Sequence, residues 1–122
     1  MSRLISPIVV PATETDPYAI PVAGCEVDEW ITATIGHNPT HHTNGALITV
    51  LIPAPRPAAH VNFLAYDLIT ALGSPLDHLP QGTALVLGQE GNAWATPPPL
   101  AHSMINTLQA SPPHHDTNRP GH

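Results

Sequence analysis

The alternation of hydrophobic and polar positions in the first half of the chain predicts an antiparallel hairpin. In residues 29–35, isoleucine and alanine occupy every second position, which is the period of a strand with one buried face. Residues 46–52, ALITVLI, are apolar at nearly every position and rich in β-branched side chains, as in a central strand covered on both faces. The turn signal Asn44-Gly45 precedes this second segment, so residues 36–45 are expected to form the polar loop between the two strands.

Residues 58–72 show the clearest helical period of the chain. The apolar positions recur every three or four residues and form one stripe: Val61, Leu64, Ala65, Leu68 and Leu72. Gly73 stands where a glycine commonly ends a helix, and Pro75 prevents the helix from continuing. A second helix is expected over residues 97–109, with Thr96 as its N-cap and three prolines in its first turn, where no N–H is needed.

Three further segments predict strands. Residues 83–87 have the pattern of a good strand, and residues 93–96 return from a tight turn. Residues 4–10 are expected at a sheet edge, because their prolines exclude a central position. Residues 46–87 then run strand, helix, strand, a crossover that is right-handed and places its two strands in parallel.

Together these elements predict an α+β fold: a small mixed β-sheet of four or five strands with two helices packed on one face. The single domain is expected to span residues 25–110. Residues 1–24 are expected to form an extended, proline-containing segment with at most an edge strand. Residues 111–122 have no apolar residue except proline, which predicts a disordered tail.

The charge balance excludes several classes of partner. The chain has nine carboxylates against three arginines and no lysine, and its formal net charge is −6. Direct nucleic-acid binding and attachment to an anionic membrane both need a cluster of cations, which three dispersed arginines do not provide. Cys25 is the only cysteine, so nothing indicates an oxidising compartment, and a lone thiol is typically a small buried side chain. No signal-like or membrane-spanning run occurs, which predicts a cytoplasmic protein.

Nine histidines in 122 residues raise the question of a metal site. The local cluster is His37, His41 and His42, within the predicted loop. Three imidazoles can bind Zn²⁺ or another divalent transition metal and leave one position open for water. However, Pro39 argues against a helix that would hold His37 and His41 on one face, and the loop contains neither a cysteine nor a carboxylate. The alternative is a polar loop whose histidines contact water.

No catalytic motif is present in the sequence. The absence of lysine excludes a P-loop, a Schiff base and a pyridoxal site. Asp77-His78 and His102-Ser103 are adjacent polar pairs, but successive side chains in a loop or helix usually point apart, so adjacency does not predict a dyad. A small-molecule enzyme with polar groups at the carboxyl ends of the strands is a third alternative, and no catalytic residue or cofactor is assigned.

Four aromatic side chains are candidates for an interface: Trp30, Phe63, Tyr66 and Trp94. Phe63 and Tyr66 lie opposite the apolar stripe of the first helix, on a side where only Asp67 is charged, so we expect another part of this chain or another chain to cover them. Trp30 either packs against a neighbouring strand or serves at a binding surface, where Trp and Tyr are enriched. The sequence therefore predicts a small non-enzymatic module that self-associates, as a homo-oligomer, or binds a larger protein. A histidine-rich metal-binding protein or small metalloenzyme is the alternative.

Overall fold

The computed structural model describes residues 3–12, 16–44, 48–55, 60–74, 76 and 79–110. The strands in this part of the chain are β1 Leu4–Ile5, β2 Ile8–Val10, β3 Tyr18–Ala19, β4 Val22–Ala23, β5 Thr40–Asn44, β6 Ile48–Ile52, β7 Ala84–Glu90 and β8 Ala93–Ala95. The helices are the 3₁₀ turn η1 Gly24–Glu26 and the α-helices α1 Val27–Ile35, α2 Phe63–Ala71 and α3 Pro99–Ala110. The predicted α+β class is confirmed.

Six strands form one sheet with the order β3-β2-β7-β6-β5, and β8 pairs with β7. Gly88 of β7 lies opposite Ile48 on one side and Ala95 on the other, so β8 lies on the same side of β7 as β2. A Cβ atom at Gly88 would lie 2.6 Å from the Thr96 carbonyl oxygen, so this position requires glycine. All described strand pairs are antiparallel.

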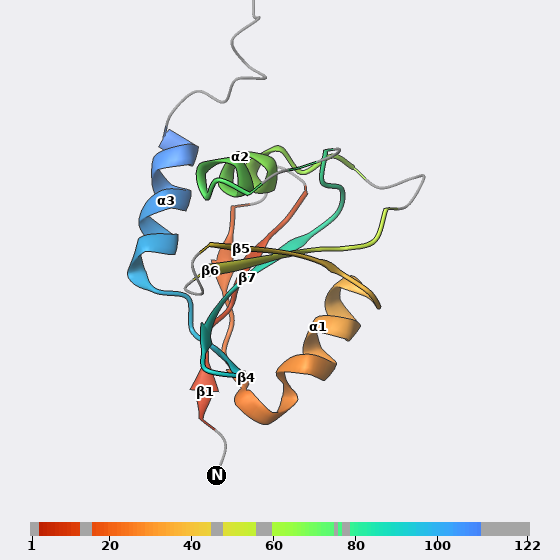
Figure 1. Cartoon of the computed structure of the whole chain (residues 1–122), viewed down its shortest axis with the longest axis vertical. Helices are drawn as coiled ribbons and strands as arrows, with labels where there is room; N and C mark the ends of the chain where they lie inside the picture. The colour runs from red at the N-terminus through yellow and green to blue at the C-terminus, as the bar shows by residue number, and fades with distance from the viewer. Residues whose placement is uncertain are drawn as a thin grey trace, which may run out of the picture.

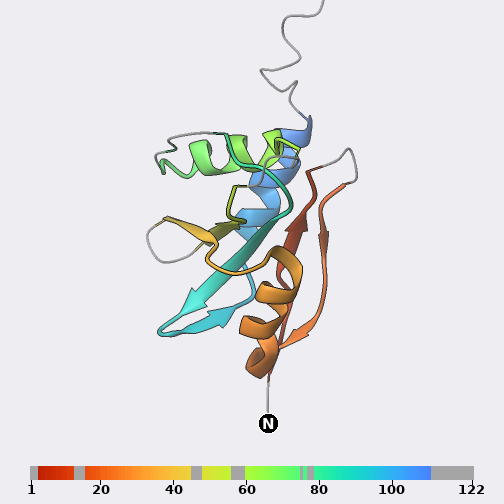
Figure 2. The ribbon, with the colours of Figure 1, turned by 90° about the vertical axis from the view of Figure 1, so that its right-hand side faces the viewer.

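The N-terminal segment forms a long two-stranded ribbon, in red and orange beside α1 in Figure 2. The pairing of β1 with β4 and that of β2 with β3 share one register, and between them the Ile20 N–H donates to the Pro7 carbonyl at 3.1 Å. The edge position predicted for residues 4–10 is wrong, because β2 has β3 on one side and β7 on the other. Pro7 and Pro11 lie just outside β2, so its own N–H groups remain available for pairing.

The connection between β6 and β7 differs from the predicted crossover. These strands are antiparallel neighbours, so the parallel arrangement expected within residues 46–87 is wrong. The chain leaves β6 and enters β7 at the same end of the sheet. An antiparallel bridge between Val61 and Gln81 joins the segment before α2 to the segment before β7. Beside this bridge, the Asn62 N–H donates to the Pro80 carbonyl at 2.8 Å.

Alternate residues of the strands divide the core into two layers. In β7, Ala84 and Val86 pack against α2 and α3, whereas Leu85 and Leu87 pack against α1. Figure 1 shows α2 and α3 on one side of the strands and α1 on the other. The two predicted helices therefore share one face, as expected, and α1 covers the opposite face.

Residues 29–35 lie in α1 and do not form the predicted strand. The buried positions recur every four residues: Val27, Ile31 and Ile35. Ala33, which completes the apparent alternation, is exposed. Asp28 and Glu29 place two carboxylates in the first turn, where they interact favourably with the positive end of the helix dipole. At the other end Gly36 adopts a φ of 87°, and its N–H donates to the Thr32 carbonyl at 2.9 Å.

Asn62 determines where α2 begins, which is later in the chain than predicted. Its side chain is 1% exposed, and Oδ1 accepts a hydrogen bond from the Ala65 N–H at 3.0 Å. Nδ2 donates to the carbonyls of Val10 and Gly82, both at 2.9 Å. Gly73 follows the C-cap Leu72 at the end of α2, as predicted, with a φ of 81°. The cap thus ties the start of α2 to β2 and to the segment that leads into β7.

Thr96 and Cys25 both differ from the expectations drawn from the sequence. Thr96 does not cap α3, because its Oγ1 accepts from the Ser6 N–H at 3.0 Å. Cys25 is exposed, not buried. Residues 111–122 and the pair Asp77-His78 lie outside the described residues. No helix in the part of the chain that the structure describes has the length and apolar character needed to span a membrane.

Candidate functional site

The second half of the predicted histidine loop is a strand. Residues 40–44 form β5, which pairs with β6 along its whole length in unbroken register. The loop predicted over residues 36–45 is therefore wrong for these positions. A sequence signal was available: a tight hairpin turn at Asn44-Gly45 requires its first strand immediately before it.

This strand separates two of the three candidate metal ligands. His41 lies opposite Leu51, which faces α1, whereas His42 lies opposite Val50, which faces α2 and α3. Neighbouring side chains of a strand point to opposite faces, so the two imidazoles diverge. His37 is exposed and precedes the strand. Among the described residues, no group of three or more His, Cys, Asp or Glu side chains is placed to hold a metal ion, and metal binding stays a prediction.

Trp94 joins β8 to β5 and α1. Its ring centroid lies 6.1 Å from that of His41, with the two planes at 47°. Its Nε1 donates to Asp28 Oδ1 at 3.0 Å. The side chain is half-buried and packs against the core layer under α1. These contacts give the indole a fixed orientation, with part of its surface accessible.

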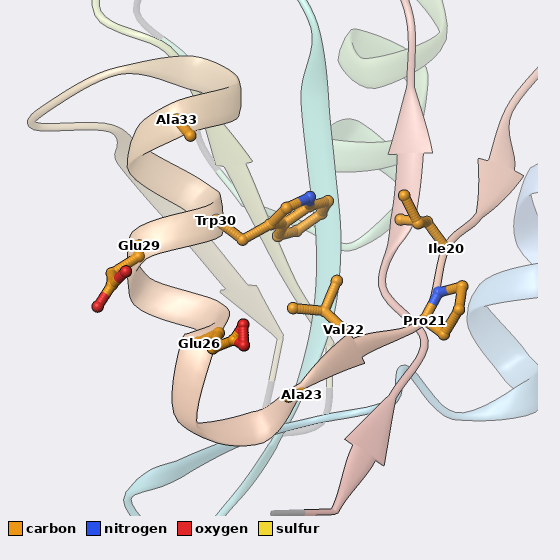
Figure 3. Close-up of a pocket in the computed structure, with 8 residues that line it drawn as sticks. All are labelled: Ile20, Pro21, Val22, Ala23, Glu26, Glu29, Trp30 and Ala33. Carbon is orange, nitrogen blue, oxygen red and sulfur yellow. The ribbon is translucent and has the colours of Figure 1, made fainter.

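Trp30 lines an open groove between α1 and the segment that leads through β4. The groove has a volume of about 450 Å³ and is lined by Ile20, Pro21, Val22, Ala23, Glu26, Glu29, Trp30 and Ala33. In Figure 3 the indole of Trp30 extends from the helix towards Ile20 and Val22. The carboxylate of Glu26 points into the same space, whereas that of Glu29 lies on the outer side of the helix. None of the lining residues is positively charged.

Phe63 and Tyr66 lie on α2, on the side of the sheet opposite α1. Both side chains are half-buried within the chain. The four predicted interface residues are therefore distributed over both sides of the sheet, with Trp30 and Trp94 beside α1. Their role at an interface stays a prediction.

β5 forms one edge of the six-stranded sheet that the structure describes. Among the described strands, β5 pairs only with β6. Alternate residues of an antiparallel strand direct N–H and C=O to opposite sides, so part of the β5 backbone points away from its neighbour. Thr40, His41 and Thr43 are exposed. The strand sequence, THHTN, contains neither a proline nor an Asp, Glu, Lys or Arg residue.

The opposite edge of the sheet is β3, which has two residues. Pro17 and Pro21 stand close on either side of it, and Asp16 precedes the first of them. Short strands, prolines and charges are the means by which natural sheets prevent their edges from pairing with other chains. Among the described residues, short length, prolines and a nearby charge thus protect the β3 edge, whereas β5 is five residues long and contains neither a proline nor an Asp, Glu, Lys or Arg residue.

Comparisons with known proteins give no relative from which a function can be transferred. No family model matches the chain, and no curated protein or solved structure is significantly similar to it. Function must therefore be inferred from the surfaces described above.

Proposed function

We propose that this chain is a non-enzymatic interaction module that self-associates by pairing β5 with β5 of a second copy. The observation that supports the proposal is the unprotected outer edge of β5. β5 has five residues in unbroken register with β6, contains neither a proline nor an Asp, Glu, Lys or Arg residue, and pairs with no second strand among the described residues.

The chemistry of the strand favours a second copy of the same chain. Antiparallel pairing of two identical strands is self-complementary and creates a closed twofold dimer, so no third copy can add at the joined edges. The chain has a formal charge of −6, and two copies repel each other wherever carboxylates face one another. No Asp or Glu lies on β5, so this edge lets two acidic chains approach without direct repulsion between the paired strands.

Pairing of the edges would also add a strand partner on the side of β5 that faces away from β6. Each added antiparallel strand supplies N–H and C=O partners at alternate residues. Thr40 and Thr43 are exposed on β5, and cross-strand threonine pairs are favourable in sheets. One such pair already exists within the chain, where Thr43 Oγ1 lies 3.2 Å from Thr49 Oγ1.

Light scattering coupled to size-exclusion chromatography tests the proposal. We expect a concentration-dependent dimer, and we expect Thr40→Lys to weaken it by about tenfold or more, because a lysine on an edge strand must lose water when another strand pairs with it. Ala19→Lys is the matched control, because it places the same charge on an exposed residue of the opposite edge. A chain that stays monomeric up to millimolar concentration contradicts the proposal. An equal effect of the two substitutions contradicts it as well.

A further inference from the structure

The groove beside Trp30 combines an apolar wall with an acidic rim. Ile20, Pro21 and Val22 form the wall on the strand side, and the Trp30 indole extends towards them from α1. The Glu26 carboxylate points into the groove below the ring (Figure 3). Such a site accommodates a side chain that is apolar along its stem and charged at its end.

The charges of the chain indicate the sign of that ligand. Two carboxylates and no cation line the groove, so an anionic group would be repelled. Lysine is absent from the sequence. Of the three arginines, Arg3 donates to Glu90 at 3.2 Å, and Arg56 and Arg119 lie outside the described residues. The lining itself thus supplies no positive group to neutralise Glu26.

We propose that this groove binds a cationic side chain, arginine or lysine, from an extended basic segment of a partner protein. The methylene stem packs against the apolar wall, as long basic side chains do on apolar surface. The charged end contacts the Trp30 ring, which attracts cations through its negative face, and it also pairs with the Glu26 carboxylate. A rim with one sign of charge excludes acidic segments, which gives the groove selectivity.

This site is separate from the edge used for self-association. Residues 28 and 30 are about 200° apart around a helix. Asp28, which binds Trp94 beside His41 of β5, therefore lies on the flank of α1 away from Trp30. The groove can bind its partner whether or not β5 is paired.

The test uses Trp30 as its own reporter. Trp30 and Trp94 are the two tryptophans, so Trp94→Phe leaves fluorescence from the groove alone. The probe is the capped tripeptide acetyl-Gly-Arg-Gly-amide, and the matched probe replaces arginine by citrulline, which has the same shape without the charge. We expect saturable changes in Trp30 emission with the arginine peptide at millimolar concentration and much weaker changes with citrulline.

Substitutions then locate the charge that matters. We expect Glu26→Gln to weaken binding about three- to tenfold. Asp16→Asn removes a charge outside the groove and can still accept the hydrogen bond from Gln109, so it should leave binding unchanged. This variant controls for attraction to the acidic chain as a whole. Circular dichroism verifies that α1 persists in each variant. Equal binding of the two peptides contradicts the proposal, as does an effect of Asp16→Asn that matches that of Glu26→Gln.

Discussion

The two edges of the sheet, β3 and β5, differ in how far they can pair with a strand of another chain. β3 is two residues long and lies between Pro17 and Pro21, so it offers little backbone for another strand to pair with. β5 is five residues long, regular, and free of proline and of Asp, Glu, Lys and Arg. Because an unprotected edge can pair with another chain, this difference is the observation on which the proposed self-association through β5 rests.

The largest expected effect comes from a change that touches neither edge. Asn62→Ala removes a buried side chain that caps α2 and donates to the Val10 and Gly82 carbonyls. We expect the free energy of unfolding to fall by about 2–4 kcal/mol, because those two acceptors lose their partner and the helix loses its cap. Urea denaturation measures the change.

This variant also separates stability from association. Its folded fraction should keep the dimerisation constant of the parent chain, because Asn62 lies away from β5. If the folded fraction of Asn62→Ala also dimerises more weakly, association depends on the stability of the whole fold and not on the β5 edge.

Two proline substitutions sharpen the comparison within β5 itself. Successive residues of an edge strand direct their N–H groups to opposite sides, so His41→Pro and His42→Pro remove different hydrogen bonds. One of them should break the ladder to β6 and cost about 1–3 kcal/mol of stability, because a β6 carbonyl loses its donor. The other should cost much less stability and abolish dimerisation, because it removes an outward donor. If neither variant separates the two effects, β5 is not the dimer edge.

The smallest expected effect concerns metal. The chain purified without an affinity tag should contain no stoichiometric zinc by elemental analysis, because β5 directs His41 and His42 to opposite faces. One equivalent of bound zinc that is lost in a His37→Ala, His41→Ala, His42→Ala variant would contradict this expectation.

The parts of the fold that follow from local patterns could be predicted from the sequence. The segments of β6, β7, β8 and α3 have one dominant period each, and Gly73 marks the end of α2. α1 could not be assigned correctly, because its buried isoleucines fit both a two-residue and a four-residue period. Only the exposure of Ala33, a consequence of tertiary packing, distinguishes the two.

The candidate sites depend on contacts that are distant in sequence. The sequence identifies Trp30 as a candidate residue, but the groove beside it also requires residues 20–23. The prolines of the N-terminal segment favour interpreting those residues as an irregular connection, so the groove could not be predicted. The start of α2 depends on Asn62 binding a carbonyl that lies 52 residues earlier in the chain. The open edge of β5 was missed because histidines favoured a loop interpretation over a hairpin arm.

Hydrogen exchange of the two edges in one sample tests the central claim most directly. Backbone amides of β5 and β3 are followed by NMR at dilute and at concentrated protein. We predict that the outward amides within Thr40–Asn44 become protected by about tenfold or more at high concentration, while Tyr18 and Ala19 exchange at the same rate throughout. Exchange at β5 that is independent of concentration, or equal gains at both edges, would contradict the account.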